Sequence, residues 1–535
     1  MIQPLIRFCL LSSLAHAAAA PVFGQTGSRL WRPEERALIA DMSVVDAVAA
    51  DENVLYVVTR AGIAVYDLRF DRWELPVTTL DGYVPAPVLA ALVDPTDQSL
   101  WLGTVTGVAN YSPRMRWHQT AAVTGGAAEL MMDREDAFAG VYLRNRSGWQ
   151  FLPRGGVMAR PVSSLPPARR QIRTASLQEI VTRHPEIETM RAGTLLDDRM
   201  RSFRYTAAAE VPLRGLVFLG TNGLGVVRYD IGIASFEVLP FGLLAPGASA
   251  VALAPGGVWV GSDGRSSRSG FTFVSSDLQR FRFEQGPRVT GFGMGAVHAM
   301  ALRGEELWAA TDGGVVVVGP SGAARRFTTV QGLPAGRVLS LAHGAGGVWS
   351  GTQRGLALVR DDGTVTRVGA QLFDRVNAVA VEGDRVWVGS RAGLGLSWVG
   401  SDRVVVPPDV AAIPELGDAI VDVALSDVVL VAALRDRIVW RWRRGDGAAA
   451  AGNGWQVERP VAELGELTSV VCDGDRIWLG GSRGFASYRP ATRAFVFYTA
   501  PGDVPGVVWD VVVDDRYLWL ATEAGLVRVD KRVVP

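Results

Sequence analysis

The sequence predicts an all-β protein, a β-propeller of about 11 to 12 four-stranded blades, and three observations support this fold class. A short apolar run that contains Trp recurs along nearly the whole chain of 535 residues. A Gly follows the Trp six residues later in most copies. Each repeat of about forty residues also holds four short apolar runs, which is the strand content of one propeller blade.

The Trp marks the second strand of each predicted blade. One copy starts at Leu307 and reads LWAATDGGVVVV, with Trp308 six residues before Gly314. A short apolar run without alternation predicts a strand that is buried on both faces, as between two packed blades. The Gly is expected to supply the positive φ of a tight turn. The aromatic recurs at Tyr56, Trp101, Trp259, Trp308, Trp349, Trp387, Trp478 and Trp519, a further copy starts at Leu216, and weaker copies lie at 137–140 and 428–442.

The other three strands of each blade surround this Trp run. An apolar run about ten residues earlier, as at 338–342, is expected to be the first strand, which lines the central channel. A third run follows the Gly, as at 525–530, and a fourth often carries an aromatic, as at Phe327. The order of the runs therefore predicts four antiparallel strands per blade.

The two ends of the chain are expected to meet in one blade. The last repeat stops after its third strand, at 529–530, whereas 29–32 resembles a fourth strand and 44–49 a first strand. The N-terminal strand is therefore expected to complete the last blade and to remove an exposed edge. Because propeller rings usually have four to eight blades, two rings are predicted over one very large ring. The sequence does not place the boundary between them.

The segment 156–210 interrupts the repeats and contains no blade motif. Ser176 followed by Glu179 forms a capping-box pattern, and Pro185 is suited to the first turn of a second helix. We expect a mainly helical insertion that bridges or packs between blades, with a lid over one propeller face as the alternative. The blades are then expected at 25–155 and at 211–535.

Residues 1–24 have the pattern of a signal peptide. Arg7 gives a basic start, 8–14 forms a short apolar core, and 15–17 or 22–24 offers a cleavage site. No later stretch has the length and hydropathy of a transmembrane helix. A periplasmic or secreted bacterial protein is therefore expected. Cys472 alone would remain after removal of the signal peptide, so no internal disulfide is expected.

The charge balance argues against a nucleic-acid partner. Lys and Arg together number 54, the same as Asp and Glu, so the chain has no net positive field. Hydrophobic residues make up 48% of the chain, which indicates a buried globular core and not a disordered protein.

The repeats resemble the two-component regulator propeller repeat, whose pattern is an apolar-Trp-apolar-Gly-Thr run followed by Gly-Leu and an aromatic. The copies LWLGTVTGVANYSP, from Leu100, and IWLGGSRGFASYRP, from Ile477, are closest to it, and the resemblance covers most of 50–530. In that family such repeats form the periplasmic sensing portion of membrane-bound hybrid histidine kinases, often with carbohydrate ligands. This sequence contains no membrane helix, kinase or Ig-like module, so the resemblance implies a free-standing, sensor-like propeller.

The sequence contains no recognised catalytic or metal-binding motif. His118, His184, His298 and His343 fall in different repeats or in the insertion, without the spacing of zinc ligands. No GxSxG elbow, Walker loop or GxGxxG at a strand–helix junction occurs. The fold is also similar to that of streptogramin lyases, in which a His on the propeller face acts as a base, and His298 and His343 invite that comparison. We assign no catalytic residue, metal ligand or cofactor from the sequence.

The repeat register places polar side chains around one mouth of the channel. Residues at the start of each first strand, and in the loop before it, are expected to surround one face of the ring. Converging polar groups with one exposed aromatic suit a polar ligand, whereas the alternative is a set of ordinary channel-mouth residues in contact with water. The candidate binding residues on this level are His298, Arg337, Arg375, Asn377, Asp422, Trp509 and Asp510.

Three classes of function fit these observations. The leading hypothesis is a non-catalytic binding or scaffold protein that uses a propeller face to hold a carbohydrate or a peptide. The alternative is a propeller-face lyase or hydrolase that acts on a carbohydrate or a cyclic peptide, and it requires His, Tyr or carboxylate groups clustered at one channel mouth. A structural role with an envelope protein as partner requires a contiguous apolar patch on the outer strands.

Overall fold

The computed structural model describes residues 30–112, 117–173, 175–187, 194–196, 201–266, 268–286, 294–344, 346–369, 375–443 and 454–535. The predicted signal peptide at 1–24 lies outside these residues. The described chain is a β-propeller protein, built from eleven antiparallel sheets. No described helix has the length and hydropathy needed to cross a membrane.

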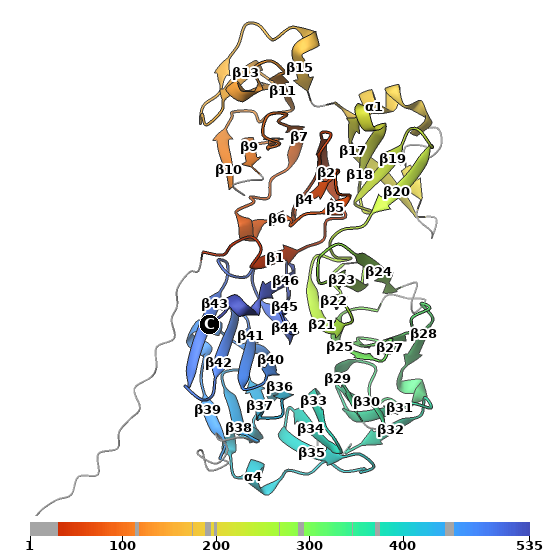
Figure 1. Ribbon diagram of the computed structural model, residues 1–535. Helices are drawn as coiled ribbons and strands as arrows, with labels where there is room; N and C mark the ends of the chain where they lie inside the picture. The colour runs from red at the N-terminus through yellow and green to blue at the C-terminus, as the bar shows by residue number, and fades with distance from the viewer. Residues whose placement is uncertain are drawn as a thin grey trace, which may run out of the picture.

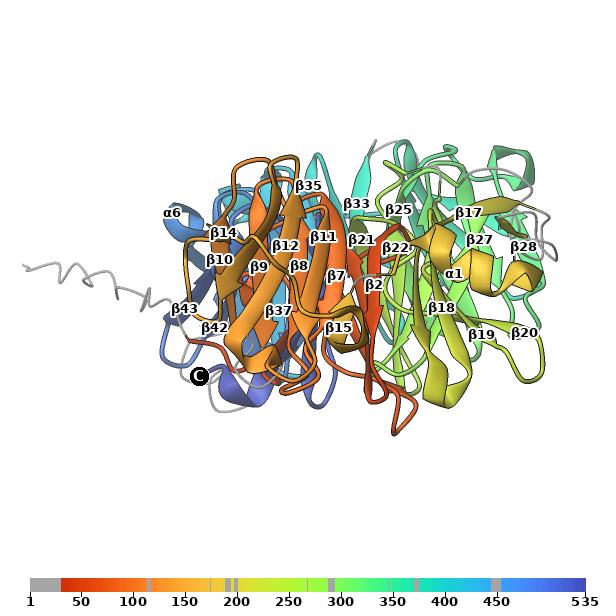
Figure 2. The ribbon, with the colours of Figure 1, turned by 90° about the horizontal axis from the view of Figure 1, so that it is seen from above.

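The sheets form two assemblies, which Figure 1 shows from the face and Figure 2 shows edge-on. We call them the four-bladed module and the seven-bladed ring, and we number the blades 1 to 4 and 5 to 11 in chain order. The strands of the four-bladed module are, in blade 1, β2 (Val45–Ala50), β3 (Val54–Thr59), β4 (Gly62–Asp67), β5 (Arg72–Trp73) and β6 (Val77–Thr78); in blade 2, β7 (Val88–Val93), β8 (Leu100–Thr104), β9 (Gly107–Ser112) and β10 (Trp117–Ala122); in blade 3, β11 (Glu129–Asp133), β12 (Gly140–Asn145), β13 (Gly148–Pro153), β14 (Arg160–Pro161) and β15 (Gln171–Arg173); and in blade 4, β16 (Thr194–Leu196), β17 (Ser202–Val211), β18 (Leu216–Thr221), β19 (Val226–Asp230) and β20 (Ser235–Leu239).

The seven-bladed ring holds the remaining strands. They are, in blade 5, β21 (Ala248–Ala254), β22 (Gly257–Ser262), β23 (Gly270–Ser275) and β24 (Phe281–Gln285); in blade 6, β25 (Val297–Arg303), β26 (Glu306–Thr311), β27 (Gly314–Val318) and β28 (Ala324–Phe327); in blade 7, β29 (Val338–Gly344), β30 (Gly347–Thr352), β31 (Gly355–Arg360) and β32 (Val365–Val368); in blade 8, β33 (Val376–Glu382), β34 (Arg385–Ser390) and β35 (Gly393–Trp398); in blade 9, β36 (Ile420–Leu425), β37 (Val429–Leu434), β38 (Ile438–Trp442) and β39 (Gln456–Glu458); in blade 10, β40 (Leu467–Asp473), β41 (Arg476–Gly481), β42 (Gly484–Arg489) and β43 (Ala494–Thr499); and in blade 11, β44 (Val508–Val513), β45 (Tyr517–Thr522), β46 (Gly525–Asp530) and β1 (Arg36–Ile39).

Helices are short and lie in the connections. The α-helices are α1 (Leu177–Arg183), α4 (Pro408–Ala411) and α6 (Val461–Leu464), and the 3₁₀ helices are η1 (Thr79–Asp81), η2 (Ala137–Ala139), η3 (Ala168–Arg170), η4 (Pro212–Arg214), η5 (Thr329–Gln331), η6 (Pro414–Gly417) and η7 (Lys531–Val533).

The seven-bladed ring is closed. Its first strands pack side by side in the order β21, β25, β29, β33, β36, β40 and β44, and β44 packs in turn against β21. The N-terminal strand β1 pairs antiparallel with β46 and supplies the fourth strand of blade 11. The prediction that the chain ends meet in one blade is confirmed, and no edge of β46 is left open.

The position predicted for that N-terminal strand is wrong. The strand is β1, with Arg36 opposite Val529 and Ile39 opposite Leu526, and not the segment 29–32. Trp31 instead packs beside Tyr498, with ring centroids 5.6 Å apart, and its Nε1 donates a hydrogen bond to Asp503. Trp31 therefore holds the N-terminal segment in place through its side chain. The strand is Arg36–Ile39, which follows Trp31 in the chain and is buried at all four residues.

The four blades of the module form an open arc. The first strands pack in the order β17, β2, β7 and β11. In the interval between β11 and β17, β15 pairs with β11 and α1 packs on β17. The module is inserted in the chain between β1 and β21, so the ring is assembled from both sides of the insertion.

The segment 156–210 is not mainly helical in its described part. The capping box is present, because Ser176 Oγ accepts from Glu179 N and the Glu179 carboxylate accepts from Ser176 N, but α1 then runs for only seven residues. Residues 202–211 form strand β17, paired with β18. The Ala-rich stretch 207–209 favours a helix by propensity, yet pairing with a neighbouring strand overrides it.

The Gly and the hydroxyl residue of the repeat motif each have a defined structural role. The Gly at the sixth position, such as Gly314 with φ 131°, lies against the fourth strand, and a Cβ there would stand 2.1 Å from the Phe327 carbonyl oxygen. The hydroxyl three residues after the Trp donates to the carbonyl of this Gly, as Thr311 does to Gly314 at 2.9 Å. The motif therefore fixes both the turn between the second and third strands and the approach of the fourth.

The two assemblies share one apolar core. Phe241, in the connection from β20 to β21, lies 4.5 Å from Trp73 of the module and 4.9 Å from Phe281 of the ring, measured between ring centroids. Gln279 adds two hydrogen bonds to the Trp73 backbone, donating to its oxygen at 2.7 Å and accepting from its nitrogen at 2.9 Å. Arg268, in the connection between β22 and β23, donates to Ser43.

Candidate ligand-binding site

A cavity of about 890 Å³ lies at the centre of the seven-bladed ring and is lined by the first strands of its blades. Each of these strands carries a β-bulge near its start, at 297–299 in β25, 376–378 in β33 and 508–510 in β44. A bulge adds one residue to the strand and changes the direction of its side chain. The bulge residues His298, Asn377 and Trp509 all line the cavity.

The structure brings the predicted residues together. Six of them line this cavity, namely His298, Arg375, Asn377, Asp422, Trp509 and Asp510. The seventh, Arg337, is next to it, because its Nε lies 3.1 Å from His298 Nε2. By contrast, His343 is exposed near the other end of β29 and is not among the cavity residues.

His298, Asp312 and Arg337 form a charged cluster at the mouth of the cavity. Asp312 Oδ1 lies 2.9 Å from His298 Nε2 and 3.0 Å from Arg337 Nε. The other oxygen, Oδ2, accepts a hydrogen bond from Ala296 N. Partial burial acts to raise the pKa of Asp312, but the hydrogen bonds from His298 and Ala296 and the nearby positive charges lower it overall. Asp312 is therefore ionised and holds both basic side chains in place.

Two further basic side chains, Arg391 and Arg435, reach the cavity from the turns between second and third strands. The backbone of Arg391 is fixed by a hydrogen bond from its nitrogen to the Arg375 oxygen at 3.0 Å, which aligns the turn with the start of β33. Sequence reasoning missed these two residues. Their position in the repeat could have indicated them. Arg391 lies four residues after Trp387, as Asp312 lies four residues after Trp308.

The basic side chains of blades 8 and 9 are poorly neutralised. Arg375 Nε donates to Asn377 Oδ1 at 2.9 Å, and Asn377 Nδ2 donates to the Ile420 carbonyl oxygen at 2.7 Å. Among the described residues, neither Arg375 nor Arg391 has a carboxylate within 4.0 Å. Arg435 has one distant partner, with Nη1 3.9 Å from Glu466 Oε1. This side of the mouth can therefore attract a negatively charged group.

Asp422 and Asp510 have a structural use. Asp422 accepts hydrogen bonds from Val423 N in its own strand and from Val470 N in the next blade, both at 2.8 Å. Asp510 does the same with Val511 N at 2.8 Å and with Val251 N at 2.9 Å. Each carboxylate therefore joins two neighbouring first strands of the ring.

Burial raises the pKa of both carboxyl groups. For Asp422 the value reaches about 7, because burial outweighs the hydrogen bonds from Val470 and Val423, and the nearby Asp510 adds to the effect. The pKa of Asp510 is raised by burial in the same way. Ser469 Oγ, 3.3 Å from Asp510 Oδ1, lies on the strand between them.

Trp509 differs from the repeat tryptophans. Its side chain is 38% exposed, whereas Trp308, Trp349, Trp478 and Trp519 are buried in the core. It lies at the bulge of β44 in blade 11 and lines the cavity. In the closed order of first strands, blades 7 and 8 are the blades farthest from blade 11. An exposed indole in a cavity offers a flat apolar face to a ligand.

The described residues contain no group of three or more metal-ligating side chains that could hold an ion. No protein-family model and no curated protein matches the sequence.

Solved structures with similar folds include the extracellular domain of BT3049 from B. thetaiotaomicron, described as a hybrid two-component system. Its TM-score is 0.43 at 14% identity, and the match covers 90% of this chain and 60% of that chain. The extracellular domain of BT4673 from the same organism has a TM-score of 0.43 at 12% identity, covering 90% of this chain and 75% of that one. The designed protein Ika8 has a TM-score of 0.38 at 14% identity, covering 53% of this chain and 96% of that one. This chain thus spans about three fifths of the length of BT3049's domain.

Proposed function

We propose that this protein is an exported, non-catalytic binding propeller that holds a polar, negatively charged ligand at the mouth of the seven-bladed ring. The ligand class is a carbohydrate or peptide that carries a carboxylate or a similar anionic group. The resemblance of the repeats to sensor propellers favours a sensor-like or scaffold role over a metabolic one.

One observation carries this proposal. Arg375, Arg391 and Arg435 converge on a single cavity that also exposes the ring of Trp509. Guanidinium groups bind carboxylates through paired, charge-assisted hydrogen bonds, and the indole adds apolar contact with the uncharged part of a ligand. Asn377 and His298 offer further polar contacts at the same level. Asp422 and Asp510 are outside the proposed contact set, because their oxygens accept backbone hydrogen bonds.

A thermal-shift screen tests the proposal. The mature protein is heated with acidic and neutral oligosaccharides, and with acidic and neutral peptides of equal length, at low and high salt. An anionic ligand is expected to raise the melting temperature, because a ligand that binds only the folded state stabilises it by mass action. The shift is expected to shrink in high salt, which screens the arginine charges.

Variants locate the binding site. Arg391→Ala and Trp509→Ala are each expected to weaken the ligand at least tenfold in titration calorimetry. Arg403→Ala serves as the matched control, because its side chain is 83% exposed and lies outside the cavity. Equal stabilisation by neutral and acidic ligands, or full affinity in both cavity variants, would refute this site.

A second candidate function is a lyase or hydrolase, and the contact between His298 and Asp312 favours it. A carboxylate bound to a histidine orients the ring and supports its use as a base. The same mixtures are therefore examined for reaction products by mass spectrometry. Product formation that is lost in His298→Ala would establish this function in place of simple binding.

A further inference from the structure

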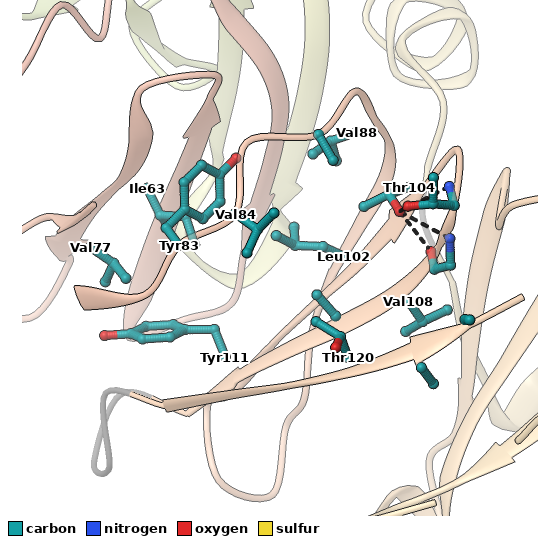
Figure 3. A pocket seen from close by; sticks show the side chains of 16 residues that line it. Ile63, Val77, Tyr83, Val84, Val88, Leu102, Thr104, Val108, Tyr111 and Thr120 are labelled. Carbon is teal, nitrogen blue, oxygen red and sulfur yellow. Dashed lines mark hydrogen bonds between the residues drawn. The ribbon is translucent and has the colours of Figure 1, made fainter. Parts of the chain in front are cut away.

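The four-bladed module contains an apolar cavity that is separate from the channel of the ring. It has a volume of about 320 Å³ and lies between blades 1 and 2. Figure 3 shows Tyr83 and Val84, on the connection between the blades, facing Leu102, Val108 and Tyr111 of β8 and β9. The lining contains no charged side chain.

The corresponding interface in the ring, between blades 6 and 7, provides an internal comparison. In both places a 3₁₀ helix with a capping box, η1 or η5, follows the fourth strand and ends at a glycine in the left-handed region, with φ 88° at Gly82 and 113° at Gly332. Val77 pairs with the residue after Gly62, and Phe327 pairs with the residue after Gly314. Val77 and Phe327 therefore occupy the same position.

Phe327 fills the interface in the ring. Its ring stacks on Trp308, with centroids 6.0 Å apart and planes 8° apart, and only 7% of it is exposed. In blade 1 the equivalent of Trp308 is Tyr56, and the equivalent of Phe327 is the smaller Val77. The cavity thus occurs where Val77 takes the position that Phe327 fills in blade 6.

A second large side chain is also replaced. In blade 7, Arg367 pairs with Ala357 and its Nε donates to the Gly332 oxygen at 3.0 Å, so its chain covers the interface. The same register position in blade 2 is Thr120, which pairs with Ala109 and is exposed. Val77 and Thr120 are therefore smaller than the residues at the matched positions, whereas Tyr83 and Tyr111 are larger than the matched Leu333 and Val359.

Two polar side chains at the cavity direct their hydroxyl groups to the protein backbone. Tyr83 donates its hydroxyl hydrogen to the Thr59 oxygen at 2.8 Å, and Thr104 donates to the Gly107 oxygen at 3.1 Å. Tyr83 and Tyr111 line the cavity. The ring of Tyr111 also packs edge-on against that of Tyr56, with centroids 6.5 Å apart. Val84, 65% exposed, stands where the cavity meets solvent. Such a lining favours a neutral apolar ligand over a charged one.

We propose that this cavity binds a small neutral aromatic group, which occupies the space that Phe327 takes at the matched interface. The size suits one or two fused rings, because apolar cavities of about 150 Å³ already accept benzene in proteins. The site lies in the four-bladed module and does not depend on the function proposed for the ring.

Binding of indole to the mature full-length protein tests this inference. Saturation-transfer NMR is recorded with indole and with the charged indole-3-carboxylate at equal concentration. Indole is expected to bind with a millimolar or lower Kd and to raise the melting temperature, whereas the carboxylate is expected to bind at least tenfold more weakly.

Two variants restore the side chains of the matched interface. Val77→Phe and Thr120→Arg are each expected to reduce indole binding at least tenfold. Val330→Phe is the control, because Val330 is 88% exposed on η5 and should leave binding unchanged. Absence of indole binding to the parent protein, or unchanged binding in Thr120→Arg, overturns the proposal even if Val77→Phe fails to fold. A channel variant such as Trp509→Ala should bind indole normally, which separates this test from that of the ring.

Discussion

At the scale of single residues, Asp422 and Asp510 show how the ring combines cohesion with a polar channel. Each carboxyl group accepts a hydrogen bond from a backbone N–H of a neighbouring blade. A side chain therefore bonds one blade to the next, whereas backbone strand pairing bonds the strands within a blade. Asn377 joins two blades in a similar way, because its Nδ2 donates to the Ile420 oxygen of the next blade. A polar residue in the first strand can thus be needed for closure of the ring and still line its cavity.

Asp422→Asn is expected to change the pH dependence of stability. The folded protein keeps the Asp422 proton up to about pH 7, whereas an unfolded chain releases it near pH 4. Between these values the folded state binds more protons, so this group's contribution to stability falls as pH rises. The fall in melting temperature from pH 5 to pH 8 is expected to be smaller in Asp422→Asn than in the parent protein.

The variant should also be less stable at pH 5, because an amide accepts only one of the two backbone hydrogen bonds, at a cost of about 1–3 kcal/mol. Asp402→Asn is the control, since the Asp402 side chain is 88% exposed. Parallel pH profiles for the parent and Asp422→Asn would show that Asp422 does not titrate in this range.

The repeat register predicted which residues share the cavity but not what each one contacts. Counting back from the Trp was sufficient for His298, Asn377 and Trp509, because a β-bulge recurs at the same place in each first strand. One partner of Asp422, the Val470 N–H, lies in the next blade, at a sequence distance that no local pattern encodes. Arg391 was missed because turns were read only for their glycines.

At the scale of elements, β1 is the strand on which closure of the ring depends. Its residues are buried, and Leu38 packs into the cluster that contains Leu518 and Val527. The sequence predicted the existence of this strand from the missing fourth strand of the last repeat. It did not predict its position, because a single short edge strand has too few residues for a period to be recognised.

Leu38→Ala is expected to lower the free energy of unfolding of the ring by about 2–5 kcal/mol, because it leaves a cavity in a packed interface. Urea unfolding followed by Trp fluorescence measures the effect. Leu30→Ala is the control, since Leu30 is 96% exposed. A loss as small as that of the control would show that β1 adds little to the stability of the ring.

The segment 156–210 shows the limit of local patterns at this scale. The capping box at Ser176 was recognised because its two hydrogen bonds are local. The strand β17 was not, because its Ala-rich sequence becomes a strand through pairing with β18, which follows it in the chain. Tertiary pairing of this kind outweighs intrinsic propensity.

At the scale of the whole molecule, the two assemblies are joined by the aromatic cluster of Trp73, Phe241 and Phe281. The number of repeats predicted more than one ring. Their division into four and seven could not be predicted, because the boundary lies in the connection 240–247, whose sequence differs little from other connections. The closed channel belongs to the larger assembly only.

Phe241→Ala is expected to uncouple the assemblies. The parent protein should unfold in one calorimetric transition, because the apolar core continues across both parts. Loss of the buried ring should cost about 3–5 kcal/mol of this coupling and separate the transition into two. Val238→Ala, at a 40% exposed position on β20, is the control. A single transition in Phe241→Ala, as sharp as in the parent, would contradict a coupling role.

The pairing of β1 with β46 also has a kinetic consequence. One strand is synthesised near the beginning of the chain and its partner near the end, and the whole module is made in between. Such a contact has to close a loop that contains all the other strands, so the ring is expected to close late in folding. Until then β46 presents an open edge, to which β1 of a second molecule can add. High concentrations during folding therefore favour strand-swapped dimers, and dilution favours the closed monomer.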